Sequence, residues 1–282
     1  MTIVAGIDVG STYTKAVLTD EHGTRLSHAL RPTGFRLGEV ADKTFAECLD
    51  IAGLSRADVN YVVATGYGRH QVAFRDVHVT DLTAAARGTL RYFPATRTVL
   101  DVGGQTMKAS RLDADGKVRS FRLNDKCAAG TGAFLEKTAR YMGYDTPEIA
   151  ALLGTSKEPV PISGVCAVFA ESEVINHLSL GTAPADIMQG AIQSLVGRAV
   201  QLLKRVRAEP EYTLIGGILR FPTMARAVQE KLGKPVNVPG AGGDGENMQF
   251  ISAEGAAVLG HKRLAKLRAE GTRPGERAQV HA

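Results

Sequence analysis

The stretch Asp8-Val9-Gly10-Ser11-Thr12-Tyr13-Thr14-Lys15-Ala16 decides the fold, because it recurs as Asp101-Val102-Gly103-Gly104-Gln105-Thr106-Met107-Lys108-Ala109. An apolar run precedes each copy, and alternating residues follow the glycine turn until an Asp-x-x-Gly turn is reached. This order predicts a strand, a tight turn, a second strand and another hairpin turn, formed twice. Either copy alone would be an ordinary glycine hairpin. Asp, Gly and Lys at the same offsets in both copies favour a functional duplication instead.

The residue types at the two turns are suited to phosphate and magnesium. Glycine at Gly10 and Gly103 lets backbone N–H groups approach an anion closely, as a loop that holds phosphate requires. The carboxylates of Asp8 and Asp101, just before these turns, are hard oxygen ligands suited to Mg²⁺, often through water. Two such loops facing each other would hold one nucleotide phosphate chain from both sides.

Composition indicates a soluble protein with two domains. The chain has 282 residues, of which 44% are hydrophobic, and no apolar run approaches the roughly 18 residues of a membrane span. The N-terminal apolar stretch contains Asp8 and lacks a basic region, so we expect no signal peptide and a cytoplasmic location. Most of the net charge of +5 lies in the tail after His261, without interleaved aromatic residues, which argues against nucleic acid.

Hydrophobic periodicity predicts further elements in both halves of the chain. We expect helices over residues 40–52, 80–92, 133–142, 146–153, 167–178, 186–207, 224–232 and 253–267, and strands over 59–64, 212–215 and 236–238. The predicted domains are residues 1–95 and residues 96–267, followed by a flexible tail over 268–282. We expect the last helix to pack back on the first half.

Two of the three cysteines lie in equivalent settings. Cys127 and Cys166 each follow a turn rich in small polar residues and precede a predicted helix, whose N-terminus stabilises a thiolate. An iron–sulfur cluster usually takes four thiolates, and Cys48 lies on a helix that is predicted to be buried. This count favours a cluster shared with a partner chain. The alternative is that both cysteines are small core thiols, and a disulfide is disfavoured in the cytosol.

The segment Asn124-Asp125-Lys126-Cys127-Ala128-Ala129-Gly130-Thr131-Gly132 resembles the signature of the BadF/BadG/BcrA/BcrD ATPase family. This family includes the activators of 2-hydroxyacyl-CoA dehydratases and the ATPase subunits of benzoyl-CoA reductase. The resemblance also covers residues 6–15, 65–69, 100–108, 161–171, 215–218 and 253–260. It implies an α/β, duplicated actin-like ATPase fold of two domains around a nucleotide cleft, as in acetate kinase, sugar kinases and Hsp70.

The resemblance also implies roles for individual residues. Cys127 and Cys166 would be the ligands of a 4Fe–4S cluster that bridges two subunits. Asp8, Asp101 and Gln105 would be catalytic, the two acids by organising Mg²⁺ and the glutamine by placing the attacking water. The implied contacts with ATP are Gly10, Ser11, Thr12, Lys15, Gly103, Gly104, Gly216 and Gly217.

The function implied by the resemblance is ATP-driven electron transfer. The sequence of the chain is similar to that of the small ATPase subunit of benzoyl-CoA reductase. We therefore expect a heterotetramer with a related larger ATPase subunit and acyl-CoA-binding reductase subunits, and ferredoxin as the electron donor. The dehydratase activators commonly have Asp-Ser where this chain has Thr106-Met107, and Cys and His within residues 82–87, where this chain has neither. The alternatives are a homodimeric dehydratase activator, an amino-sugar kinase of the same fold, and a nucleotide-switched scaffold.

Overall fold

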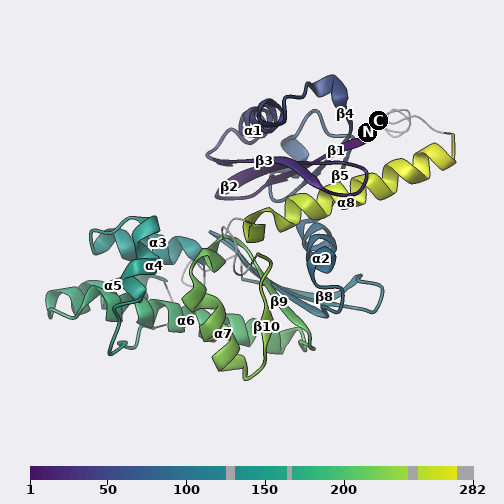
Figure 1. Cartoon of the computed structure of the whole chain (residues 1–282). Helices are drawn as coiled ribbons and strands as arrows, with labels where there is room; N and C mark the ends of the chain where they lie inside the picture. Colours follow the sequence, from purple (N-terminus) through teal and green to yellow (C-terminus); the bar gives the residue numbers. More distant parts are fainter. Residues whose placement is uncertain (125–130, 164–166, 241–246, 272–282) are drawn as a thin grey trace. The chain divides into compact units, whose positions relative to one another are not determined.

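A computed structural model describes residues 1–124, 131–163, 167–240 and 247–271, and the chain forms two compact units (Figure 1). Unit 1 comprises Met1–Pro94 and Gln249–Ala282, and unit 2 comprises Ala95–Met248. The residues of the last helix, which the sequence-based division counted within 96–267, therefore belong to unit 1 from Gln249 onward. That helix continues to Ala269, so the first two residues of the predicted tail are helical.

Unit 1 contains a five-stranded sheet in the order β3-β2-β1-β4-β5. Its strands are β1 (Ile3–Val9), β2 (Tyr13–Thr19), β3 (Arg25–Pro32), β4 (Val59–Thr65) and β5 (Val77–His78). Strand β1 pairs antiparallel with β2 and parallel with β4. The first sequence copy thus forms the expected strand, turn and strand.

Unit 2 repeats this topology, with the sheet order β10-β9-β6-β7-β8. Its strands are β6 (Thr98–Val102), β7 (Met107–Leu112), β8 (Val118–Asn124), β9 (Tyr212–Ile215) and β10 (Val236–Asn237). Strand β6 pairs antiparallel with β7 and parallel with β9, as β1 does with β2 and β4. The duplication read from the sequence is therefore a duplication of sheet topology.

Helices cover both faces of the first sheet. The helices of unit 1 are α1 (Leu37–Ala52), α2 (Asp81–Tyr92) and α8 (Asn247–Ala269), the last beginning in unit 2. Alternate residues of β1 point to opposite faces, so Ile7 packs with Phe45 of α1 while Val4 packs with Ala253 of α8. Figure 1 shows α1 and α8 on opposite sides of this sheet.

The core of unit 2 is built mainly around one long helix. The helices of this unit are α3 (Gly132–Tyr141), α4 (Ile149–Leu153), α5 (Ala167–Ser179), α6 (Pro184–Arg205) and α7 (Pro222–Leu232). One face of α6, which includes Ile192, Leu195 and Leu203, is buried against the sheet and the neighbouring helices. Short 3₁₀ turns lie at Arg56–Asp58, Arg69–Gln71, Thr146–Glu148 and Gly217–Arg220.

The largest differences from the sequence-based boundaries are at two helix starts. Helix α1 begins at Leu37 rather than 40, after Arg36, whose side chain makes no capping hydrogen bond and so gives no start signal. Helix α8 begins at Asn247 rather than 253, because its first residues pack into the cores and not onto a polar surface. Among the described residues, no helix has both the length and the apolar character needed to cross a bilayer.

Glycines allow α8 to lie directly against its neighbours in unit 1. A Cβ at Gly255 would overlap the carbonyl oxygen of Ala84 in α2 and come within 2.6 Å of the amide nitrogen of Gly88. A Cβ at Gly6 of β1 would likewise overlap the carbonyl oxygen of Ala253. These neighbours are backbone atoms, which cannot move away as the end of a flexible side chain can. The close approach of α8 therefore depends on glycine at these positions.

We expect Gly255→Ala to destabilise the protein by about 1–3 kcal/mol, the usual cost of overpacking a core. The matched control is Gly197→Ala in α6, where no atom lies within 4 Å of the added Cβ. That change should stabilise the helix by about 0.5–1 kcal/mol. Thermal unfolding of both variants measures the difference. A Gly255→Ala protein as stable as the parent would contradict the packing described for α8.

Candidate nucleotide site

The first predicted phosphate loop connects β1 to β2 in unit 1. Asp8, near the end of β1, is buried, and its Oδ2 lies 3.0 Å from Nζ of Lys15, the residue opposite it on β2. The amide of Gly10 donates to the carbonyl of Tyr13 at 3.2 Å and closes the turn. The hydroxyl of Thr33 donates to the carbonyl of Gly10 at 2.9 Å, which holds the loop against the end of β3. The positively charged ammonium group of Lys15 therefore lies beside the loop.

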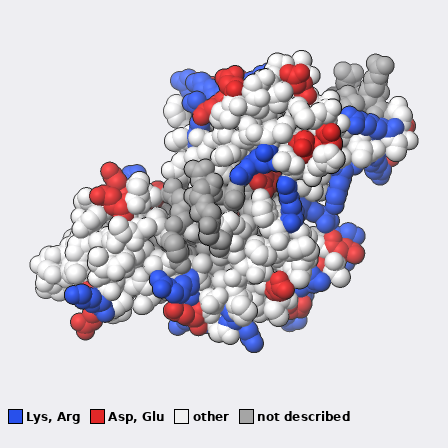
Figure 2. Space-filling model, in the orientation of Figure 1, with Lys and Arg blue, Asp and Glu red and all other residues white. Residues whose placement is uncertain are grey.

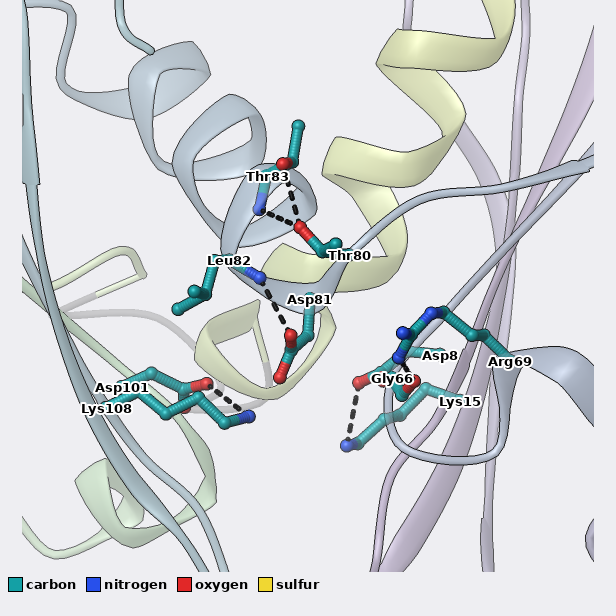
Figure 3. A network of polar contacts seen from close by, with 10 residues as sticks. All are labelled: Asp8, Lys15, Gly66, Arg69, Thr80, Asp81, Leu82, Thr83, Asp101 and Lys108. Atoms are coloured by element: carbon teal, nitrogen blue, oxygen red, sulfur yellow. Dashed lines mark hydrogen bonds and ion pairs between the residues drawn. The ribbon is translucent and has the colours of Figure 1, made fainter. Parts of the chain in front are cut away.

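The second predicted loop, between β6 and β7 in unit 2, has the same construction. Asp101 on β6 lies opposite Lys108 on β7, with 3.7 Å between Oδ2 and Nζ. The amide of Gly103 donates to the carbonyl of Thr106 at 2.9 Å, which matches the bond made by Gly10. Gln105 is exposed at the tip of this loop, and Gly104 is half-buried. Figure 3 shows the two aspartate–lysine pairs, each within its own sheet.

The two loops share a further feature, a glycine that lies directly beside the aspartate. Gly66, directly after β4, has φ +86°, and a Cβ there would overlap Oδ1 of Asp8. Gly216, directly after β9, has φ +106°, and a Cβ there would overlap the carbonyl oxygen of Val102 and lie 2.9 Å from Oδ1 of Asp101. Gly217 follows as the first residue of a 3₁₀ turn. Each carboxylate therefore lies directly against the backbone of a glycine, in space that the side chain of any other residue would occupy.

Gly66 and Arg69 have no role predicted from the sequence, although their segment is part of the resemblance. Arg69 donates from Nη1 to the carbonyl of Gly66 at 3.0 Å, which fixes the turn beside Asp8 (Figure 3). The signal available in the sequence is the position of Gly66 after a buried strand, which matches the position of Gly216 in the other half. That equivalence is visible only when the two parallel strands, β4 and β9, are compared.

We expect Gly216→Ala to weaken MgATP binding by about tenfold or more, because the added methyl group would displace Asp101 or the end of β6. Gly233→Ala is the control, since Gly233 has φ +66° but no atom within 4 Å of the added Cβ. Titration with a fluorescent ATP analogue compares the two variants. Equal affinities in both would show that the contact with Asp101 is unimportant.

The loop between β6 and β7 is bonded directly to the start of α3. The amide of Gly132 donates to the carbonyl of Gly103 at 3.0 Å, and the amide of Ala133 donates to the carbonyl of Gly104 at 2.7 Å. Amides in the first turn of a helix have no partner within the helix, so these two bonds satisfy them with the loop. A displacement of this loop is therefore transmitted to the first turn of α3.

The two cysteines predicted as cluster ligands, Cys127 and Cys166, lie outside the described residues. Helix α3 begins at Gly132 and α5 at Ala167, so each described helix follows one of them in the chain. Lys137 of α3 and Glu171 of α5 join the two helices by an ion pair of 2.7 Å. Within the described residues, no group of three or more His, Cys, Asp or Glu side chains could hold a metal ion. The fit of a cluster therefore depends on the chemistry of the two thiols.

Residues 5–260 match the family model described as the BadF/BadG/BcrA/BcrD ATPase family. The chain belongs to this ATPase family. The resemblance noted in the sequence is thereby confirmed, and ATP is the nucleotide that the family identifies for this protein.

Relatives of two kinds are similarly close to this chain. A 2-hydroxyisocaproyl-CoA dehydratase activator from Clostridioides difficile is 36% identical over 258 residues, which cover 90% of this chain and 92% of the relative. A benzoyl-CoA reductase subunit from Thauera aromatica is 36% identical over 281 residues, covering 95% and 97%. A solved structure of the C. difficile activator with bound ADPNP has a TM-score of 0.88 and 33% identity, and covers 95% of this chain and 98% of its own.

The actin-like ATPase fold expected from the sequence is confirmed by these solved structures. A sugar kinase structure at 16% identity shares the fold alone, so it lends no support to a kinase activity.

Proposed function

We propose that this chain hydrolyses ATP and uses the energy to pass a low-potential electron to a partner enzyme that acts on a CoA thioester. The observation that carries the proposal is the pair of hydrogen bonds from Gly132 and Ala133 of α3 to Gly103 and Gly104. They connect a loop suited to phosphate with the helix that follows Cys127. Family membership supports the nucleotide part, and the names of the relatives support the partner part.

In this proposal Asp8 and Asp101 organise Mg²⁺, and the glycine turns after them receive the phosphate oxygens on backbone amides. Lys15 and Lys108 lie beside the two carboxylates and place positive charge near the phosphate chain. The exposed amide of Gln105 orients the attacking water. Ser11 and Thr12 contact phosphate from the first loop, and the turn at Gly216 and Gly217 receives the adenosine. Each aspartate holds its position because it lies against a glycine.

Cys127 and Cys166 would hold a 4Fe–4S cluster, whose chemistry when bound is one-electron transfer at low potential. Thiolates are the ligands that such a cluster requires. Because Cys48 is buried in unit 1, this chain offers two ligands and a second subunit offers the rest. The ion pair of Lys137 with Glu171 fixes α3 against α5, the two helices that follow these cysteines.

Exposed apolar side chains near the start of α5 support docking of another protein there. Val168 and Phe169 are 67% and 64% exposed, directly after the segment that contains Cys166. Ile175 and Leu180 add further exposed apolar surface along the same helix and just beyond it. The view in Figure 2 shows few charged side chains over the end of the molecule where α5 lies. Large exposed apolar groups in one place are typical of an interaction site.

Two partner enzymes are supported about equally, because the dehydratase activator and the reductase subunit are each 36% identical to this chain. If the partner is a reductase, the chain is one of two related ATPase subunits in a complex with acyl-CoA-binding subunits, and ferredoxin is the electron donor. If the partner is a 2-hydroxyacyl-CoA dehydratase, the chain forms a homodimer that activates it. Thr106 and Met107 beside the second loop favour the reductase.

Anaerobic purification of the native complex, with its subunits counted, tests the proposal. The complex should contain iron and hydrolyse ATP. With a strong reductant it should show ATP-dependent turnover of benzoyl-CoA or of a 2-hydroxyacyl-CoA. Turnover of benzoyl-CoA selects the reductase and turnover of the hydroxy ester selects the dehydratase. A native complex that hydrolyses ATP but contains no iron would refute electron transfer.

A further inference from the structure

A groove in unit 2, between α6 and the end of β8, is lined by positive and hydrogen-bonding groups. It encloses about 540 Å³, and one stripe of α6 forms most of its wall. Arg198 and Arg205 contribute guanidinium groups and Gln193 and Gln201 contribute carboxamides, at the spacing of successive helical turns. The other face of α6 lies in the core, so this stripe is the part of the helix that is left for a partner.

Gly197 lies in the middle of this stripe. No atom lies within 4 Å of the position that its Cβ would occupy, so the space above it is open. Glycine in the interior of a helix lowers stability by about 0.5–1 kcal/mol relative to alanine. Nothing in the packing of α6 requires glycine here. Its effect is to leave the groove open along the helix backbone.

The wall opposite α6 is the edge of a sheet. β8 pairs with β7 on one side, and the structure places no further strand beside it among the described residues. Phe121 and Leu123 are 46% and 42% exposed, so this edge strand presents apolar side chains to solvent, as a strand that pairs with another chain does. The carbonyl of Phe121 accepts a hydrogen bond from the side chain of Arg122 at 2.8 Å, so it can be reached from outside the ladder.

Basic side chains outnumber acidic ones in this region. β8 carries Arg119 and Arg122, and α6 from Ile187 to Arg205 carries Arg198, Lys204 and Arg205, with no carboxylate in either segment. Arg119 pairs with Asp113, and the net charge of β8 and this part of α6 is positive beside the exposed strand. A second copy of the chain would bring arginines against arginines if two β8 edges paired. An acidic partner meets no such repulsion.

We propose that an extended acidic segment of a partner protein binds along β8 as an added strand, with its carboxylates in the groove against Arg198 and Arg205. Strand addition supplies backbone hydrogen bonds, and the groove supplies selectivity for acidic side chains. This interaction surface is separate from the loops that are proposed to bind ATP and does not rest on the proposed function.

The test uses the full chain and a fluorescein-labelled octapeptide, (Thr-Glu)₄, with (Thr-Lys)₄ as the opposite-charge probe. Anisotropy at low salt should show binding of the acidic peptide only. The double change Arg198→Glu and Arg205→Glu, and Gly197→Gln, which fills the groove without removing charge, should each weaken binding at least about tenfold. Lys204→Glu, a charge reversal on the same helix outside the groove lining, should change it less than about twofold.

Amide hydrogen exchange shows where the peptide lies. Because alternate residues of a strand direct their amides to the same side, bound peptide should protect alternate amides of β8, such as those of Arg119, Phe121 and Leu123. Thermal unfolding confirms that each variant is folded. The proposal is overturned by no binding of the acidic peptide, by equal weakening in Lys204→Glu, or by binding without protection of β8.

Discussion

Replacement of Asp101 by asparagine is expected to lower ATP turnover by about 10²–10³-fold while the protein stays folded. Asn has nearly the same shape as Asp, so it fits beside Gly216 at the end of β6. It lacks the negative charge that organises Mg²⁺, and electrostatic groups of this kind contribute a few kcal/mol to a transition state. Steady-state phosphate release, measured at saturating MgATP, gives the comparison with the parent protein.

The control for this experiment is Asp115→Asn, in the exposed turn that follows β7 in the same unit. It removes the same charge at a distance from the loop between β6 and β7, and turnover should stay within about twofold of the parent. Circular dichroism and thermal unfolding establish that both variants are folded. A well-folded Asp101→Asn protein with near-normal turnover would refute the role of Asp101.

Loss of either Cys127 or Cys166 is expected to abolish iron binding. Four iron atoms per two subunits should be present in the parent, because one four-iron cluster would bridge the pair. Either Cys127→Ala or Cys166→Ala removes two of four thiolates in a homodimer and one in a heterodimer. Iron and acid-labile sulfide, measured after anaerobic purification, should fall to background in both variants.

Cys48→Ala is the matched control, because the buried side chain of Cys48 stays a protonated thiol rather than the thiolate that binds iron. Burial raises its pKa to about 11, and its Sγ lies 3.2 Å from the hydroxyl of Ser27. It packs in the core with Phe45 and Leu49, so its replacement costs stability but not iron. Full iron content in a purified monomer, or retention of iron in Cys127→Ala, would rule out a shared cluster.

The fold was largely predictable because the sequence contains the same pattern twice. The spacing of Asp8 and Lys15, and of Asp101 and Lys108, was enough to predict two hairpins, and the structure places each pair in register across a hairpin. The glycines beside the carboxylates could not be found in this way. Gly66 and Gly216 come from parallel strands that join β1 and β6 only through long crossovers, so their contact with the aspartates depends on tertiary structure.

Other features were not visible in the sequence for a similar reason. The sequence predicted that the last helix packs back on the first half, but not the close backbone approach that Gly6, Gly88 and Gly255 permit, because no periodicity reports such an approach. The link from Gly103 and Gly104 to α3 is made by backbone atoms, which every residue carries. Side-chain chemistry therefore predicted which residues belong to the site, and the backbone contacts show how the loop is connected to a helix.

The proposed coupling requires that the bound nucleotide change the environment of the cluster. Two quantities report this change: the rate at which an iron chelator removes iron from the reduced protein, and the midpoint potential, each measured in MgATP and in MgADP. Because the loop at Gly103 and Gly104 is bonded to the start of α3, we expect both quantities to differ between the two nucleotides and Asp101→Asn to reduce the difference. Identical rates and identical potentials in MgATP and MgADP would contradict the coupling.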